Sequence, residues 1–188
     1  MSNRFDIVDT PLAMLKVIQR KPIGDSRGYF ERLFCDEELA ELLNGRVIRQ
    51  INHTLTEKTG TVRGLHYQRQ PHAEMKFVTC LKGEVYDVAV DLRAGSPTFL
   101  HSYAEVLSEG NWKTIMIPEG FAHGFQTLGE NCELLYFHTE TYTPEAETGL
   151  HAMDPALAIQ WPLSVTEQST RDQQHPMIDH NTFKGVTV

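Results

Sequence analysis

The sequence has little cysteine and no long apolar run, and both features narrow the class of protein. Its three cysteines, Cys35, Cys80 and Cys132, are odd in number and show no C-x-x-C spacing, which predicts reduced thiols and no disulfide framework. No segment approaches the roughly 18 consecutive apolar residues that a membrane-spanning helix needs, so we expect no contact with a membrane. Residues 1–16 lack a basic stretch followed by an uninterrupted apolar one. We therefore expect no signal peptide and a cytoplasmic location.

Positive charge is also scarce. The chain carries 17 Lys and Arg against 25 Asp and Glu, a formal net charge of -8. This excess of negative charge repels a phosphate backbone over most of the surface, so we expect no nucleic-acid partner. A few clustered arginines can still bind a small diphosphate on such a protein.

Internal repeats and low-complexity segments are absent, and Pro and Gly are spread along the chain. A chain of 188 residues can form one core that buries roughly 70% of its unfolded surface. We therefore expect residues 1–188 to form a single domain.

Residues 36–44 carry the clearest helix pattern. Asp36 is a suitable N-cap, Leu39, Leu42 and Leu43 share one face, and Gly45 is a typical helix end.

From Val47 to Thr139 the pattern changes to short segments rich in Val, Ile, Phe and Tyr. Turn signals separate them at Thr59-Gly60, Lys82-Gly83, Gly95-Ser96-Pro97, Glu109-Gly110 and Gly129-Glu130-Asn131. The spacing of about 8 to 15 residues leaves little room for crossover helices and favours an antiparallel sandwich or barrel. We expect an all-β jelly roll.

Residues 84–92 alternate between two faces, and one face contains Asp87 and Asp91. Solvent exposure is the favoured explanation for these carboxylates. The alternative is a polar barrel interior, where an inward carboxylate would orient a site residue.

Residues 61–68 form a predicted strand that carries Arg63 and His66 around Gly64. Strict alternation places the two side chains on opposite faces. If both serve one site, Gly64 marks a bulge or twist that brings them together. Taken alone, His66 is typical of a structural core or surface histidine.

Residues 118–125 contain Pro, Gly and His at P-x-G-x-x-H spacing, which resembles the second motif of the cupin superfamily. The first cupin motif needs an H-x-H pair, which this chain lacks. A metal ion held by histidines would need His53, His66 and His123 to converge, and we expect no metal site.

Several segments, taken in order from about Gly24 to Asp172, resemble the dTDP-4-dehydrorhamnose 3,5-epimerase family. They are Gly24-Asp25-Ser26-Arg27-Gly28-Tyr29-Phe30, Gln50-Ile51-Asn52-His53, Arg63-Gly64-Leu65-His66, Lys76, residues 83–93, Ser96-Pro97-Thr98-Phe99, residues 117–125 and Leu135-Tyr136.

The resemblance implies a cupin-type jelly-roll barrel with short peripheral helices and no cofactor. It implies an isomerase that inverts C3, C5 or both in a nucleotide-diphosphate 4-keto-6-deoxyhexose through an enolate. It further implies a homodimer whose N-terminal segments cross the interface, and a place in deoxysugar, O-antigen or lipopolysaccharide biosynthesis. The alternatives are a metal-dependent cupin oxygenase or isomerase and a non-catalytic sugar-binding cupin.

The same resemblance assigns roles to individual residues. His66 matches the catalytic base, Asp172 the carboxylate that orients it, Lys76 the cation that supports the enolate, and Tyr136 the acid on the opposite face. The residues that match substrate contacts are Arg27, Arg32, Gln50, Asn52, Arg63, His123, Tyr142, Glu147 and Arg171. Among them, Tyr142 matches the aromatic side chain that stacks on the base.

Three positions depart from the family pattern. Arg32 stands where the family has a substrate-contacting Glu, Ala73-Glu74-Met75 stands where Ala-Gln-Gly is usual, and Arg171 replaces the usual Lys. Because a guanidinium is a donor and cytosine offers an acceptor edge, Arg32 leads us to expect a base other than thymine, with cytidine as the first candidate. The alternative is that Arg32 turns to solvent and Glu31 takes over its place, which would keep thymidine. The expected substrate is therefore a dTDP- or CDP-sugar.

Overall fold

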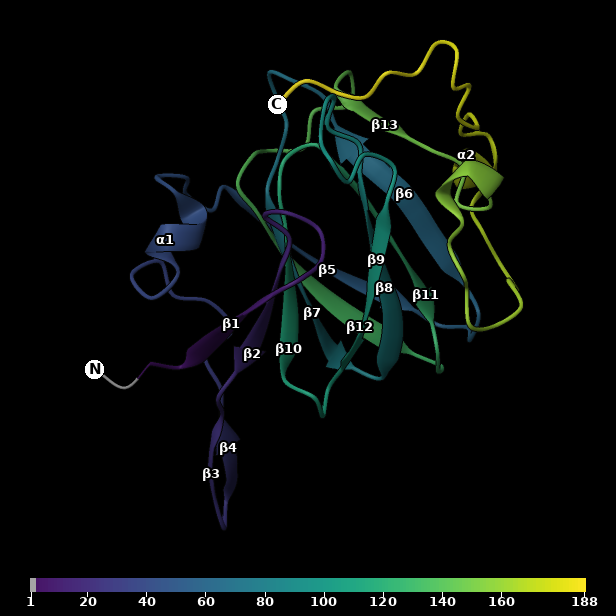
Figure 1. Cartoon of the computed structure of the whole chain (residues 1–188). Coiled ribbons are helices and arrows are strands. Elements are labelled where there is room, and N and C mark those ends of the chain that lie inside the picture. The colour runs from purple at the N-terminus through teal and green to yellow at the C-terminus, as the bar shows by residue number, and fades with distance from the viewer. Residues whose placement is uncertain (1–2) are drawn as a thin grey trace.

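Two antiparallel β-sheets face each other in the computed structural model, which describes residues 3–188 (Figure 1). The six-stranded sheet has the order β1 (Phe5–Asp9), β2 (Lys16–Arg20), β10 (Lys113–Ile117), β7 (Lys76–Lys82), β12 (Cys132–His138) and β5 (Gln50–Thr56). The five-stranded sheet has the order β13 (Glu147–Gly149), β6 (Val62–Gln68), β11 (Phe121–Thr127), β8 (Glu84–Asp91) and β9 (Ser102–Ser108). Apart from the pairs β1–β2 and β8–β9, neighbouring strands are not consecutive in the sequence, and this arrangement confirms the cupin-type jelly roll.

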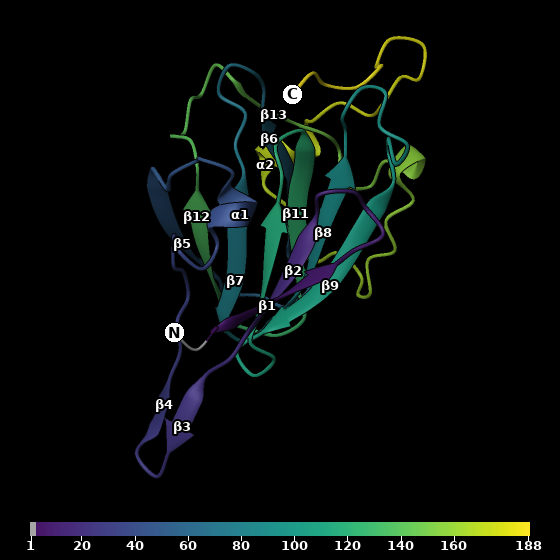
Figure 2. The same cartoon turned by 60° about the vertical axis from the view of Figure 1, so that its left-hand side comes forward.

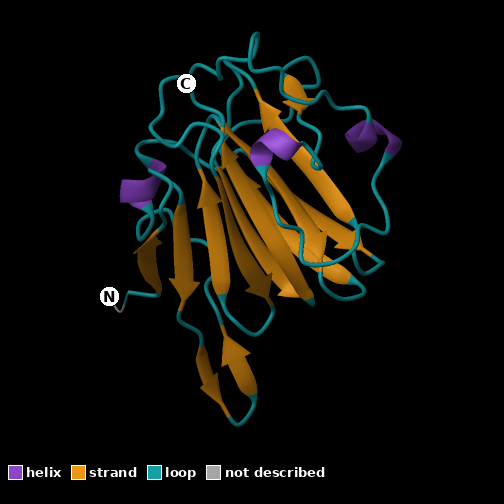
Figure 3. Cartoon of the chain, turned by 45° about the vertical axis from the view of Figure 1, so that its right-hand side comes forward, coloured by secondary structure: helices purple, strands orange, loops and turns teal. Residues whose placement is uncertain are grey.

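A separate hairpin of β3 (Ile23–Asp25) and β4 (Gly28–Phe30) projects from one end of the two sheets (Figure 2). The helices are short and lie at the periphery (Figure 3). They are α1 (Ala40–Leu43), the 3-10 turn Pro155–Leu157 and α2 (Thr170–Gln173). None of the helices within residues 3–188 has the length and apolar character needed to cross a membrane.

The predicted turn signals from Thr59 to Asn131 lie between consecutive strands, except that Lys82 is the last residue of β7. The cysteines are also as predicted, since Cys35, Cys80 and Cys132 are all free thiols.

The helix predicted for residues 36–44 is wrong in length. Only residues 40–43 form an α-helix, and its N-cap is Leu39, which makes no side-chain capping bond. Asp36 instead accepts a hydrogen bond from the neighbouring amide of Glu37. Without a cap at residue 36, residues 36–39 form turns that lead into the helix.

The alternation in β8 is confirmed, but the favoured explanation of its acidic face is wrong. Val88 and Val90 belong to an apolar cluster covered by the C-terminal segment, whereas Val85 and Ala89 belong to the core between the sheets. Because both faces of β8 are covered, Asp87 and Asp91 are fully buried.

The strand β6 bends at Gly64, as predicted. Its pairing with β11 shifts register between His123 and Phe125. A side chain at Gly64 would lie 2.6 Å from the backbone oxygen of His123, and the φ angle of +113° also favours glycine there. The extra residue turns both Arg63 and His66 toward the same cavity.

Candidate active site

A cavity of about 220 Å³ opens between the two sheets. Strands β5, β7 and β12 form one wall, and β6, β11 and β13 form the other. The predicted site residues that line it are Gln50, Asn52, Arg63, His66, Lys76, His123, Tyr136, Tyr142 and Glu147.

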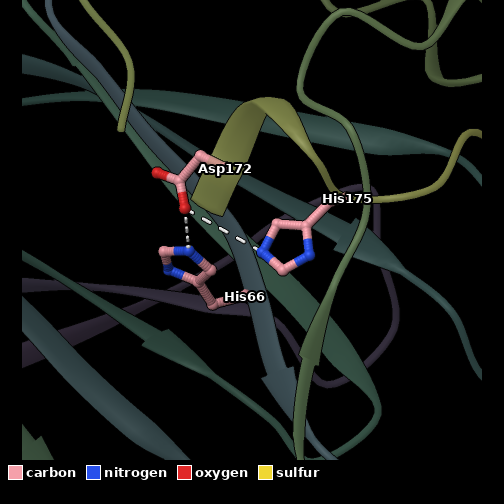
Figure 4. Close-up of side chains that lie close together, drawn as sticks. All are labelled: His66, Asp172 and His175. Carbon is pink, nitrogen blue, oxygen red and sulfur yellow. Dashed lines mark hydrogen bonds and ion pairs between the residues drawn. The ribbon is translucent and has the colours of Figure 1, made fainter. Parts of the chain in front are cut away.

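His66 and Asp172 form a hydrogen-bonded dyad, although 106 residues separate them in the sequence (Figure 4). Nε2 of His66 lies 2.7 Å from Oδ1 of Asp172, and Oδ2 of Asp172 accepts the amide of Gly64 at 3.1 Å. Ser169 caps α2 and so fixes the turn that carries Asp172. Burial raises the pKa of Asp172, but the hydrogen bond and charge of His66 outweigh it and leave that pKa below its usual value.

This hydrogen bond selects one form of the imidazole. An ionised carboxylate only accepts hydrogen bonds, so Nε2 of His66 carries the proton that faces Asp172. The other nitrogen, Nδ1, then keeps its lone pair. His66 is thereby prepared to accept a proton through Nδ1.

Tyr136 reaches the cavity from β12, on the sheet opposite His66. Its ring lies edge-on to His123, with centroids 6.1 Å apart. Burial, followed by the negative charge of Asp87, raises the pKa of Tyr136 above its ordinary value. The phenol therefore keeps its proton at neutral pH and can act as an acid.

Lys76, which is buried, belongs to a chain of polar groups that extends across three strands to the more exposed amides of β5. Its Nζ lies 2.9 Å from Oε1 of Glu74, whose Oε2 lies 2.7 Å from Nδ1 of His138. On the far side of that ring, Nε2 of His138 lies 3.2 Å from Nδ2 of Asn52. Oδ1 of Asn52 accepts a hydrogen bond from Nε2 of Gln50 at 3.1 Å. These contacts fix the position of Lys76 and of the amides on β5.

His123 on β11 is held by a buried carboxylate. Its Nε2 lies 3.0 and 2.9 Å from the two oxygens of Asp87 on β8. Asp87 therefore has the second of the two roles considered for it, namely the orientation of a site residue.

A group of polar side chains surrounds the mouth of the cavity. The hydroxyl of Tyr142 donates to Oε2 of Glu147 at 2.8 Å, and Arg171 forms an ion pair with the same carboxylate. The ring of Tyr142 is half exposed, so one face is accessible to a planar ligand.

Arg27 and Arg32 lie outside the cavity of their own chain. Arg27 is on the projecting β3–β4 hairpin, where its exposed guanidinium pairs with Asp25. Arg32 pairs with Glu38, and the neighbouring Glu31 pairs with the buried Arg20.

The three histidines considered for a metal ion do not converge. His53 is exposed on the outer face of β5 and pairs with Glu133, while His66 and His123 bond to different carboxylates.

Sequence reasoning missed that Glu74 and His138 line the cavity and that His175 lies beside the dyad. His138 shares the alternation of Leu134 and Tyr136 on β12, and this signal could have identified it. Glu74 was visible only as a departure from the family pattern. His175 follows α2 and is positioned by tertiary folding alone.

Comparison with known proteins identifies the family of this chain. The family described as dTDP-4-dehydrorhamnose 3,5-epimerase matches residues 9–180. The dTDP-4-dehydrorhamnose 3,5-epimerase of Salmonella typhimurium is 40% identical over 175 residues, which cover 92% of this chain and 95% of that protein.

Solved structures agree. The dTDP-6-deoxy-D-glucose-3,5-epimerase of Legionella pneumophila, in complex with dTDP-4-keto-L-rhamnose, is 39% identical, with a TM-score of 0.89 over 98% of this chain and 100% of that one. The Bacillus anthracis dTDP-4-dehydrorhamnose 3,5-epimerase with bound TDP and pyrophosphate is 33% identical, with a TM-score of 0.89 over 93% and 99%. The protein therefore belongs to the dTDP-4-dehydrorhamnose 3,5-epimerase family.

Proposed function

We propose that the protein is an isomerase that epimerises a nucleotide-linked 4-keto-6-deoxyhexose at C3 and C5. One observation carries this proposal: the His66–Asp172 dyad and the protonated Tyr136 face one cavity from opposite sheets. A base on one side of a sugar ring and an acid on the other are the two groups that inversion of a carbon centre requires.

The chemistry follows from the ketone at C4, which acidifies the hydrogens on C3 and C5. Nδ1 of His66 takes a proton from the carbon, and the electron pair moves into the enolate oxygen. Lys76 supports the negative charge on that oxygen. Tyr136 then delivers a proton to the opposite face of the same carbon, and the ketone forms again. Proton transfers of this kind typically contribute about 10²–10⁴-fold.

The proposed nucleotide is dTDP. Arg32, the reason to consider cytidine, pairs with Glu38 outside the cavity, and the relatives described above contain dTDP-4-keto-L-rhamnose or TDP. Competition between dTDP, CDP and GDP, measured by calorimetry, tests the choice. Preference for dTDP that Arg32→Glu leaves unchanged supports it, and preference for CDP would restore the cytidine hypothesis.

A homodimer is the proposed assembly. Tyr29 and Phe30 on the hairpin are more than 60% exposed, and Ile51 and Leu55 form an apolar outer face on β5. A second copy packed on these surfaces would cover them and could bring Arg27 to the partner's cavity. Light scattering at micromolar concentration measures the assembly.

The remaining parts of the proposal concern organisation and place. All three apolar clusters pack on the same two sheets, which supports a single domain over residues 1–188. We further propose that the enzyme acts in the cytoplasm and that its product supplies a deoxysugar for O-antigen or lipopolysaccharide synthesis. Accumulation of the 4-keto sugar in a strain lacking the gene would support this place.

Product analysis by NMR tests the activity itself. A dTDP-4-keto-6-deoxyhexose should yield the 3,5-inverted sugar, whereas inversion at C3 alone would match relatives described as 3-epimerases. Activity that requires an added metal would favour the metal-dependent cupin alternative.

A further inference from the structure

A second histidine lies against the dyad and has no role in the proposed reaction. Nε2 of His175 is buried and has no hydrogen-bond partner within residues 3–188. Oδ1 of Asp172 lies 3.9 Å from this nitrogen, which is too far for a hydrogen bond (Figure 4). A buried, unpaired ring nitrogen aimed at a carboxylate is costly unless a ligand uses it.

Together, His66, Asp172 and His175 offer two imidazole nitrogens and one carboxylate oxygen, all within 4.8 Å of one another. Bonds of about 2.0–2.2 Å to Zn²⁺ place tetrahedral ligands roughly 3.3 Å apart. To reach this spacing, the His175 ring moves inward by roughly 1.5 Å, and the contact between His66 and Asp172, now 2.7 Å, lengthens by about 0.6 Å. Such a donor set suits Zn²⁺ and its divalent first-row neighbours, and it leaves one position for water.

The dyad is also open from its far side. A second cavity, of about 560 Å³, is lined by His66, Asp172, Glu167 and Gln168, among other residues. A cation can therefore approach the dyad without passing through the first cavity.

We propose that His66, Asp172 and His175 form a binding site for Zn²⁺ that switches off the catalytic base. The metal takes the lone pair of Nε2 of His66, and the proton that Nε2 carried moves to Nδ1. With Nδ1 protonated, the imidazole has no lone pair left for a proton from carbon. Asp172 remains ionised and becomes a ligand, so the protons balance without any redox step.

This mode of inhibition has a distinct signature. Since the metal binds beside the sugar cavity and not inside it, Zn²⁺ should lower kcat and leave KM nearly unchanged. Removal of the metal by EDTA should restore activity. The inhibition, but not the binding, rests on the proposed function.

Calorimetric titration of the full chain with Zn²⁺ alone, without nucleotide or sugar, tests the site. We expect one Zn²⁺ per chain for the wild type and at least tenfold weaker binding for His175→Ala. His175→Asn, which keeps a polar side chain of similar size, should lose binding equally, and His180→Ala, an exposed histidine nearby in the sequence, should bind as the wild type does. Thermal unfolding of each variant identifies any that do not fold.

Absence of stoichiometric binding, or equal binding by the wild type and both folded His175 variants, would overturn the site. If Zn²⁺ binds as expected but leaves solvent exchange into the sugar unaffected, the site stands and the assignment of His66 as the base is wrong. The two failures are therefore distinguishable.

Discussion

His138 and Glu74 form a buried pair, with Nδ1 of the imidazole 2.7 Å from Oε2 of the carboxylate. Glu74 also forms an ion pair with the ammonium of Lys76. One carboxylate therefore contacts both the imidazole and the ammonium at the cavity wall. Glutamate at this position is suited to this arrangement because only an anion compensates the buried Lys76 charge.

Glu74→Gln should therefore destabilise the fold in a pH-dependent way. Burial raises the pKa of Glu74, but Lys76 and His138 outweigh it and lower the value from 4.5 to about 2. A depressed pKa contributes stability above pH 4.5 that disappears as the pH falls through about 2. We expect a loss of about 3 kcal/mol near pH 6 that shrinks toward pH 2, measured by urea unfolding.

Glu130→Gln is the matched control, because Glu130 is exposed in a turn. A Glu74→Gln variant whose deficit stays constant from pH 6 to pH 2.5 would contradict the ion-pair account.

Asp172→Asn should lower kcat, but by a smaller factor than His66→Asn does. The amide keeps the volume of the carboxylate but no longer selects the form of His66 with a free Nδ1, so part of the enzyme holds the imidazole reversed. A fall of up to about 10⁴-fold is expected, as for the equivalent change in a Ser-His-Asp triad. A loss as large as that of His66→Asn, in a folded variant, would show that Asp172 does more than orient the ring.

Tyr136→Phe should separate deprotonation from reprotonation. The ring stays in place, but the proton donor on the face opposite His66 is gone. We expect deuterium exchange at C3 to continue while inversion at C5 or the product stereochemistry is lost, as read by NMR. An unchanged product profile would make Tyr136 a core residue.

Arg27 should act in the partner's cavity. Arg27→Ala and His66→Asn should each abolish most activity alone. When the two variants are mixed and allowed to exchange subunits, mixed dimers contain one complete site, and roughly a quarter of wild-type activity should return. No recovery would mean that Arg27 does not complete a site across the interface.

Much of the architecture could be predicted because local signals dominate it. Turn residues such as Gly83 and Pro97 separate the strands, and the alternation around Tyr136 places it inward. The burial of Asp87 could not be predicted. Alternation separates the two faces of β8, but it does not reveal that the C-terminal segment covers the Val88 and Val90 face, which leaves the Asp87 face turned toward the barrel interior. The predicted length of the first helix was wrong because helix propensity alone does not define the first residue of a helix, and Asp36 does not act as its N-cap.

In the site, the residues that a motif carries were predictable, whereas those placed by tertiary contacts were not. His66 and Lys76 belong to recognisable segments and line the cavity. His175 approaches the dyad only because α2 packs beside β6. Arg27 lies on the projecting hairpin, outside the cavity of its own chain, and the proposed role for it in a partner's cavity cannot be positioned from one sequence.

The most direct test of the account is incorporation of solvent deuterium into a dTDP-4-keto-6-deoxyhexose incubated with the protein in D₂O. The account predicts deuterium at C3 and C5 with the wild type, and none at either carbon with folded His66→Asn. Exchange that His66→Asn leaves intact, or no exchange with the wild type, would contradict the claim that His66 removes protons beside the ketone.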